Sequence, residues 1–326
     1  MLNARIERLP VLVLSPHNRC NCRCVMCDIW KLDSKQEISV TDLERHLDDI
    51  ERLRVEWLVF SGGEPLMHSD LFRLAAAVRA RGIRTTLLTT GLLLERYAKP
   101  VAANLDDAIV SLDGPRDIHD AIRRVPRAFD MLHAGVCALH RENPDFPVSA
   151  RCTVQKVNHT RLRDTARAAR ALGLRSISFL AADLTSSAFN RPTLWTIEQQ
   201  APIALRAEDL PALDQELDAL SREWESSGFV AESREKLERI ALHFRANLKL
   251  AEPAAPRCNA PWVSAVIEAD GTVRPCFFHR PIGRLNGVSL TEILNGPAAL
   301  HFREHLNVAT DPICQSCVCS LYRTPD

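Results

Sequence analysis

Three cysteines near the start of the chain have the spacing of cluster or metal ligands. Cys20, Cys24 and Cys27 form a C-x3-C-x2-C pattern. A [4Fe–4S] cubane has four irons, so three thiolates leave one iron open to a further molecule. The pattern therefore predicts a catalytic [4Fe–4S] cluster, with a structural zinc site or reduced thiols without a ligand as the alternatives. We interpret the intervening Cys22 as a small buried residue.

A second group of cysteines lies near the end of the sequence. Five thiols can ligate one cubane completely with one to spare, but they cannot complete two cubanes. The spacing also permits a zinc site with four cysteine ligands, which would stabilise the domain without redox chemistry. The five residues are Cys258, Cys276, Cys314, Cys317 and Cys319.

Two motifs with polar residues directly follow strand-like segments. In Ser61-Gly62-Gly63-Glu64-Pro65 the two glycines let the backbone approach a ligand, and free peptide groups there can bind a polar zwitterion. Ser111 and Asp113 offer a hydroxyl and a carboxylate that suit a ribose diol, although a strand-end turn held by the aspartate is the simpler interpretation.

The elements that must position these motifs alternate between strand and helix. Amphipathic stretches over 41–53, 70–81 and 159–172 predict helices. Six β-α units in series favour a parallel sheet with right-handed crossovers, and six are too few for a closed eight-unit barrel. We therefore predict an α/β fold, a partial (β/α)6 TIM-type barrel, with a smaller C-terminal α+β cluster-binding domain. The strand-like segments are 11–15, 56–60, 84–89, 107–112, 148–154 and 176–180.

The predicted boundaries are 1–182 for the barrel, 183–252 for a bridge with two helices (209–226 and 232–249), and 253–326 for the C-terminal domain. In that last part a hairpin is expected about Asp270-Gly271, followed by a helix near 290–294. In parallel barrels the chemistry lies at the carboxyl ends of the strands. The first cysteines, the glycine turn and Ser111 each follow a strand, so they are expected to meet at that rim.

Composition limits the class of protein. The 326 residues contain 41 basic and 41 acidic side chains, giving a formal net charge of zero. This balance speaks against a nucleic-acid partner, as do the few aromatic residues. We see no signal peptide and no apolar run of membrane-spanning length, and therefore expect a cytoplasmic protein in a compartment that keeps thiols reduced.

Together these motifs resemble the radical S-adenosylmethionine (radical SAM) superfamily. The resemblance covers the cysteine triad and Gly62-Gly63-Glu64, which matches the GGE motif of the family. It implies that the open iron chelates S-adenosylmethionine, that the glycine motif contacts its methionine amino group, and that Ser111 and Asp113 reach its ribose or carboxylate. Arg123 and Arg151 are possible clamps for a carboxylate, with a surface or ion-pair role as the alternative.

The C-terminal cysteines resemble the SPASM/twitch extension of the same superfamily, which binds auxiliary [4Fe–4S] clusters. Cys319 is expected to be a packed thiol; the alternatives are that it replaces one of the ligands, donates a hydrogen atom or faces the substrate. Of the five thiols, the resemblance implies four auxiliary-cluster ligands: Cys258, Cys276, Cys314 and Cys317.

The implied reaction is reductive cleavage of S-adenosylmethionine to a 5′-deoxyadenosyl radical, which takes a hydrogen atom from a small molecule or peptide. Oxidation, epimerisation or bond formation would follow, and a reducing partner such as flavodoxin or ferredoxin would supply electrons. Two other hypotheses stay open: a zinc-stabilised scaffold protein and a cluster-bearing RNA-modifying enzyme. His243 and His301 are taken as structural. Five polar residues are possible substrate contacts, with a solvated or capping role as the alternative: Asp183, Asn190, Arg191, His279 and Arg280.

Overall fold

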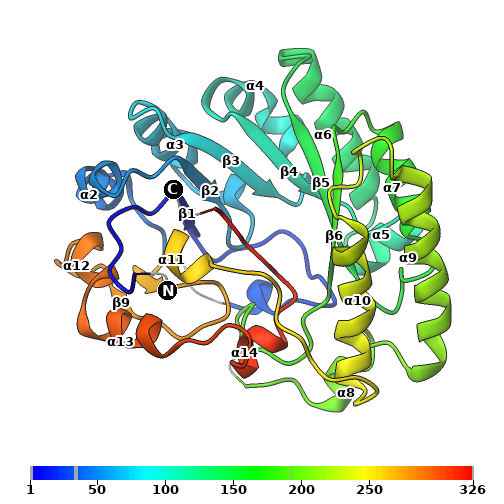
Figure 1. The fold of residues 1–326 in the computed structure, drawn as a ribbon. Helices are drawn as coiled ribbons and strands as arrows, with labels where there is room; N and C mark the ends of the chain where they lie inside the picture. The colour runs from blue at the N-terminus through cyan, green and yellow to red at the C-terminus, as the bar shows by residue number, and fades with distance from the viewer. Residues whose placement is uncertain (1–2, 33–35, 192, 325–326) are drawn as a thin grey trace.

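A computed structural model describes residues 3–32, 36–191 and 193–324 of the chain. Six parallel strands follow one another across the sheet in chain order, as the sequence predicts. Helices cover one face of this curved sheet, and the other face is open toward the C-terminal part of the chain (Figure 1). This is the predicted partial barrel. Its strands are β1 (Val11–Leu14), β2 (Trp57–Phe60), β3 (Arg84–Thr89), β4 (Asp107–Ser111), β5 (Val148–Val154) and β6 (Ile177–Ala181).

The alternation of residue types along each strand explains why the sheet has one packed face. In β5, Val148, Ala150, Cys152 and Val154 are buried, whereas Arg151 between them is exposed. Because successive side chains point to opposite faces, the apolar set packs against the helices and Arg151 lies on the open face. Burial of each larger aliphatic side chain contributes about 1.5–3 kcal/mol.

Helices connect the strands and form the outer layer. The expected helices over 70–81, 159–172, 209–226 and 232–249 are present with slightly shorter bounds. The stretch 41–53 is not one helix, because a turn at Arg45 and His46 separates two short ones. The α-helices are α1 (Val40–Glu44), α2 (Leu47–Arg52), α3 (Leu71–Arg79), α4 (Leu94–Asn104), α5 (Arg116–Arg123), α6 (Ala128–Glu142), α7 (Leu162–Ala171), α8 (Ile197–Gln200), α9 (Leu210–Trp224), α10 (Arg234–Asn247), α11 (Ala260–Val263), α12 (Leu290–Leu294), α13 (Pro297–His305) and α14 (Pro312–Gln315). The described residues also form the 3-10 turns η1 (Ile29–Lys31), η2 (Pro65–Met67) and η3 (Ala207–Asp209).

The C-terminal part continues the same sheet. The predicted hairpin is β7 (Ser264–Ile267) with β8 (Thr272–Arg274), and β9 (Gly283–Arg284) adds an outer strand. β7 pairs in parallel with β1, so the sheet has nine strands in the order β6-β5-β4-β3-β2-β1-β7-β8-β9. The sequence did not predict this junction, because it joins residues at opposite ends of the chain.

The last described residues return across the open face. Figure 1 shows the segment after α14, in red, running back toward the amino end of β1. Asn259 N–H donates to Leu321 O at 2.9 Å, and Arg323 forms an ion pair with Glu56 at 3.1 Å, just before β2. In the described ranges of the chain, no helix is both long and apolar enough to cross a membrane.

Candidate functional site

The first cysteine loop and the glycine turn lie against each other at the carboxyl ends of β1 and β2. Glu64 N–H donates to Arg19 O at 2.8 Å, directly before Cys20. A Cβ atom on Gly63 would lie 1.9 Å from Arg19 O, and Gly62 has a φ of +101°. Only glycine permits both this contact and this conformation without strain. The sequence thus placed these two motifs correctly at one rim.

Glu64 fastens the turn from inside the protein. Its carboxylate is fully buried and accepts hydrogen bonds from Thr90 N–H at 2.7 Å, Thr90 Oγ1 at 2.6 Å and Thr89 Oγ1 at 2.8 Å. Burial raises the pKa of Glu64, and these donors oppose that rise. The Glu64 side chain therefore holds β2, β3 and the turn together. The groups that the turn can offer to a ligand are those of its backbone.

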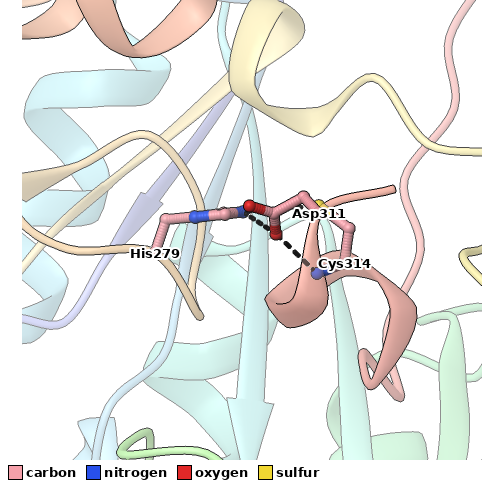
Figure 2. A group of neighbouring side chains, drawn as sticks. All are labelled: His279, Asp311 and Cys314. Carbon is pink, nitrogen blue, oxygen red and sulfur yellow. Dashed lines mark hydrogen bonds and ion pairs between the residues drawn. The ribbon is translucent and has the colours of Figure 1, made fainter. Parts of the chain in front are cut away.

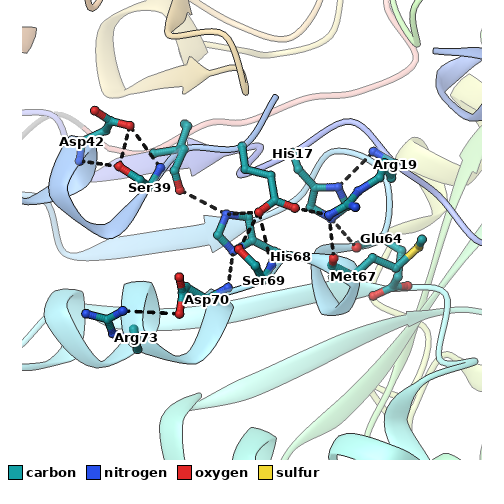
Figure 3. A network of polar contacts seen from close by, with 12 residues as sticks. His17, Arg19, Ser39, Asp42, Glu64, Met67, His68, Ser69, Asp70 and Arg73 are labelled. Carbon is teal, nitrogen blue, oxygen red and sulfur yellow. Dashed lines mark hydrogen bonds and ion pairs between the residues drawn. The ribbon is translucent and has the colours of Figure 1, made fainter. Parts of the chain in front are cut away.

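Further polar contacts fix the loop before the first cysteine (Figure 3). His17 Nδ1 accepts from Arg19 N–H at 3.0 Å, so its Nε2–H donates to Glu64 O at 2.7 Å. The Arg19 guanidinium forms an ion pair with Glu37 and donates to Met67 O at 3.0 Å. The loop is thus held at a defined position over the turn.

The thiols of the triad are crowded together in a poorly solvated pocket of the loop. Burial raises the pKa of Cys20 to about 11 and that of Cys27 to about 12, and the neighbouring cysteines contribute. A positively charged metal centre would be needed to keep both as thiolates near neutral pH. Three sulfur donors without a carboxylate or histidine are the ligands that an iron–sulfur cluster takes, so the residues fit this cofactor.

Cys22 and Cys24 point into a small apolar cluster with Leu92 and Ala128. Cys22 is 1% exposed, which agrees with its interpretation as a small buried residue. A hydrogen bond from Cys22 is the main cause that lowers the pKa of Cys24 to about 6, with a further contribution from Arg123. Arg123 Nη1 lies 3.5 Å from Cys24 Sγ.

Asp113 is a buried structural partner of Arg123. Its carboxylate is 2.6 Å from Arg123 Nη2 and accepts from Thr153 N–H at 2.9 Å. Its backbone N–H donates to His119 Nδ1 at 3.2 Å. Sequence reasoning proposed Arg123 as a clamp for a ligand carboxylate, whereas the structure pairs it with Asp113 and Cys24. A cofactor contact by Asp113 stays a prediction.

Ser111 and Arg151 lie side by side on the open face. They are register partners in β4 and β5, and Arg151 Nε donates to Ser178 Oγ of β6 at 3.4 Å. Arg151 is exposed, and Ser111 is half-buried. These two side chains are free to meet a ligand on that face, as the predicted assignment requires.

The five C-terminal thiols form a second crowded group. The charge of a Cys258 thiolate helps to raise the pKa of Cys276, and both cysteines help to raise the pKa values of Cys314 and Cys317. Burial raises the pKa of Cys276 to about 11 and that of Cys314 to about 12. Cys317 N–H donates to Cys314 O at 3.2 Å, which makes the tight C-x2-C turn. A second all-sulfur donor set is therefore present and fits an auxiliary cluster.

His279 adds a contact that the sequence did not indicate (Figure 2). Its Nε2 lies 3.4 Å from Cys314 Sγ and 3.8 Å from Asp311 Oδ1, and Asp311 accepts from Cys314 N–H at 2.9 Å. His279 is 4% exposed and packs against Phe302. These contacts support a structural role for His279, the alternative to a substrate contact. The nitrogen, oxygen and sulfur atoms of the three residues could also hold a metal ion such as zinc.

The segment after β6 holds the first cysteine loop. Arg191 and Asp183 form a buried ion pair, and Arg191 Nη2 donates to Met26 O at 3.1 Å. Asn190 Nδ2 donates to Asp28 O at 3.2 Å. Trp195 Nε1 donates to the carboxylate of Asp28 at 2.8 Å. These contacts support structural roles for Asp183 and Arg191, because their charges pair with each other between β6 and the loop.

An open parallel barrel with two sets of crowded thiols defines an iron–sulfur protein whose chemistry lies at the carboxyl rim. Family comparisons agree: the Radical SAM superfamily model matches residues 14–181, and the SPASM model, an iron–sulfur cluster-binding domain, matches 258–318. The chain belongs to the radical SAM superfamily. The predicted cofactors, [4Fe–4S] clusters and S-adenosylmethionine, are confirmed at the level of these two families.

Curated relatives match about half of the chain. Fe-coproporphyrin III synthase of Methanosarcina barkeri is 34% identical over 156 residues, which are 47% of this chain and 39% of that protein. Pre-heme d1 synthase of Dinoroseobacter shibae is 31% identical over 163 residues, 49% and 40% of the two chains. The match thus spans about two fifths of the length of these relatives.

Solved structures share the fold over nearly the whole chain. SuiB of Streptococcus suis bound to S-adenosylmethionine has a TM-score of 0.69 and 14% identity, covering 97% of this chain and 73% of its own. anSMEcpe with bound AdoMet has a TM-score of 0.68 and 18% identity, covering 94% and 86%. At such low identity the likeness concerns the fold.

Proposed function

We propose that this chain is a radical SAM enzyme that cleaves S-adenosylmethionine reductively and abstracts a hydrogen atom from a small molecule or peptide. The observation that carries the proposal is the pair of all-sulfur donor sets, one with three thiols on the β1 loop and one near the end of the chain. The relatives named above are synthases of Fe-coproporphyrin III and of pre-heme d1, and a structure of SuiB holds a precursor peptide. Both substrate classes are therefore proposed.

In this proposal Cys20, Cys24 and Cys27 hold the catalytic cluster, and Cys258, Cys276, Cys314 and Cys317 hold the auxiliary one. When bound and reduced, the first cluster supplies the electron that breaks a carbon–sulfur bond of S-adenosylmethionine, which yields the 5′-deoxyadenosyl radical. A second cluster that accepts an electron would make oxidation of the substrate the outcome; epimerisation and bond formation are the other reaction types proposed.

The protein's own groups bind S-adenosylmethionine and orient it. Gly62 and Gly63 present backbone to the methionine part of the cofactor, while the buried Glu64 keeps the turn in position. Ser111 and Arg151 on the open face offer a hydroxyl and a guanidinium to the ribose or to a carboxylate. The segment 183–191 holds the cysteine loop against the rim through its contacts with Met26 and Asp28.

The remaining proposals follow from this chemistry. Domain boundaries at 182 and 252 fit the end of β6 at Ala181 and the linker after α10. Thiol-ligated clusters need a reducing compartment, which supports a cytoplasmic location. A flavodoxin or ferredoxin would supply the electron.

Anaerobic purification tests the proposal. Brown protein with about eight irons and eight sulfides per chain, two cubanes, is expected, together with 5′-deoxyadenosine formation after reduction by dithionite. Changing Cys20, Cys24 or Cys27 to Ala should abolish cleavage and leave about four irons. Cys319→Ala should leave the iron content unchanged. Cleavage retained in any triad variant would overturn the ligand assignment.

A zinc-stabilised scaffold is the second candidate, and the grouping of His279, Asp311 and Cys314 favours it. Colourless protein that contains zinc and forms no deoxyadenosine under dithionite would support this candidate and exclude the radical enzyme.

A further inference from the structure

Exposed arginines surround the outer side of the first cysteine loop. Arg23 lies between the buried Cys22 and Cys24, and its side chain is exposed. Arg124 ends α5 with a φ of +53° and is also exposed. Within the described ranges, neither Arg23 nor Arg124 has an ion-pair partner. Arg127, the next exposed cation, is 81% exposed and only 3.7 Å from Asp130.

The backbone brings these arginines together. Arg23 N–H donates to Arg123 O at 3.1 Å, and Val25 N–H donates to Ile122 O at 3.1 Å. The cysteine loop is therefore bound to the last turn of α5. Arg23 and Arg124 flank this junction, so two unpaired positive charges lie on one small surface of a chain whose net charge is zero.

This surface is also directly connected to a ligand of the first cluster. Arg123 sits between Ile122 and Arg124 in the chain, and its guanidinium reaches inward to Cys24 Sγ. The exposed Arg23 and Arg124 are therefore separated from Cys24 Sγ only by the contact between the cysteine loop and the last turn of α5. The open face with Ser111 and Arg151 belongs to the other side of the sheet from the α5–α6 layer, so a protein bound at the junction leaves the substrate side accessible.

The acidic groups nearby do not neutralise the junction. Asp120 accepts the backbone N–H groups of Arg127 and Phe129 at 2.8 Å. Asp130 pairs with Arg116, and Asp113 pairs with the buried Arg123. Asp117 is exposed at the opposite end of α5. Charge complementarity therefore points to an acidic partner.

We propose that the junction of the cysteine loop with α5, marked by Arg23 and Arg124, is the docking surface for an acidic electron-transfer protein. The proposal rests on the proposed function, which requires an electron donor for the first cluster. Redox complexes of this kind have small interfaces and depend on electrostatic steering, so two charges near the cluster have a large effect on association.

The test compares charge reversal at the junction with a matched reversal elsewhere. The test variant is Arg23→Glu/Arg124→Glu, and the control is Arg141→Glu/Arg175→Glu. Arg141 lies in the last turn of α6, as Arg124 lies at the end of α5, and Arg175 precedes β6 at the amino end of the sheet. Both controls are exposed. The two variants thus carry the same change in charge and a similar change at a helix C-terminus.

Two readouts are measured with reduced flavodoxin and, separately, reduced ferredoxin: equilibrium binding and the rate at which the cluster absorbance bleaches. At low salt the test variant should bind each donor on the order of ten-fold more weakly than the wild type does, and its cluster should be reduced on the order of ten-fold more slowly. The difference should shrink near 0.15 M salt, where the Debye length is about 8 Å. The neutral variant Arg23→Gln/Arg124→Gln should fall between the two.

Dithionite separates this proposal from the proposed function. Iron content and the extent of reduction by dithionite should be the same in all variants. A test variant that binds the donors like the wild type, a control that is equally impaired, or a wild type that binds neither donor at low salt would overturn the docking surface. Wild-type protein that forms no deoxyadenosine with dithionite would instead overturn the proposed function.

Discussion

Arg123 Nη1 lies 3.5 Å from Cys24 Sγ, and Nη2 of the same guanidinium lies 2.6 Å from the carboxylate of Asp113. One buried side chain thus joins a thiol of the first cysteine loop to the end of β4. Hydrogen bonds to cluster sulfurs favour the reduced, more negative state and raise the reduction potential. If Cys24 ligates the first cluster, as proposed, Arg123 is a positioning residue that acts on the cluster through this thiol.

The change Arg123→Met should lower the reduction potential of the first cluster, because a positively charged donor is lost. It should also reduce the free energy of unfolding by about 3–5 kcal/mol, since Asp113 stays buried without its partner. EPR-monitored redox titration measures the first effect. Arg123→Lys retains the charge and should restore part of the potential; a potential unchanged in Arg123→Met would contradict the role.

Gly63→Ala should disrupt the contact between the glycine turn and the cysteine loop, because the added Cβ would lie 1.9 Å from Arg19 O. We expect a large loss of iron and of S-adenosylmethionine binding, measured by iron analysis and equilibrium dialysis. Gly82→Ala is the control: Gly82 has a φ of +72° but open space around it, so only a backbone cost of about 1 kcal/mol is expected. Equal losses in the two variants would argue against the close approach.

Stability should fall on acidification because of His119. Burial lowers its pKa to about 3 from 6.5, with Arg123 as a second cause. The unfolded chain takes up this proton first, so the contribution is complete above pH 6.5 and is lost as the pH falls toward 3. At pH 5.5 the loss is about 1.4 kcal/mol.

His119→Asn tests this dependence, since an amide oxygen can accept from Asp113 N–H but does not titrate in this range. Urea unfolding at pH 7 and pH 5.5 should show a smaller difference in the variant than in the wild type. An equal difference in both would exclude His119 as a source of the acid sensitivity.

His279→Phe distinguishes a hydrogen-bond donor from a metal ligand. Each iron of a cubane takes one protein ligand, and His279 Nε2 is only 3.4 Å from Cys314 Sγ, so His279 would donate to that sulfur. The variant should keep its full iron content and show a lower reduction potential of the auxiliary cluster. Loss of one zinc per chain by metal analysis would instead support a zinc site at His279, Asp311 and Cys314.

The barrel could be predicted because its signals are local. Short apolar runs such as 84–89 and 148–154 coincide with β3 and β5, because burial of one strand face requires apolar residues within a short continuous stretch of sequence. The spacing of Cys20, Cys24 and Cys27 likewise needs no tertiary information. The turn that breaks the helix expected over 41–53 left no comparable signal.

Contacts between distant segments could not be predicted in this way. The contact of Arg123 with Cys24 joins residues from different β-α units, and the pairing of β1 with β7 joins the two ends of the chain. For His279 and Asp183 the sequence leaves open both a substrate contact and a solvated or capping role. Their partners, Cys314 and Arg191, are apparent only once the fold brings them together.

The pairing of β1 with β7 has a consequence for biosynthesis. β2 can cover one edge of β1 early, but the other edge must wait until residues 264–267 of β7 have been made. During that time an apolar parallel strand is open to pairing with other chains. The three cysteines that follow β1 are made at the same early stage, whereas Cys314 and Cys317 are made after β7. The first cysteine loop therefore forms beside an unfinished sheet, and the second thiol group is completed only after the strand that closes that sheet.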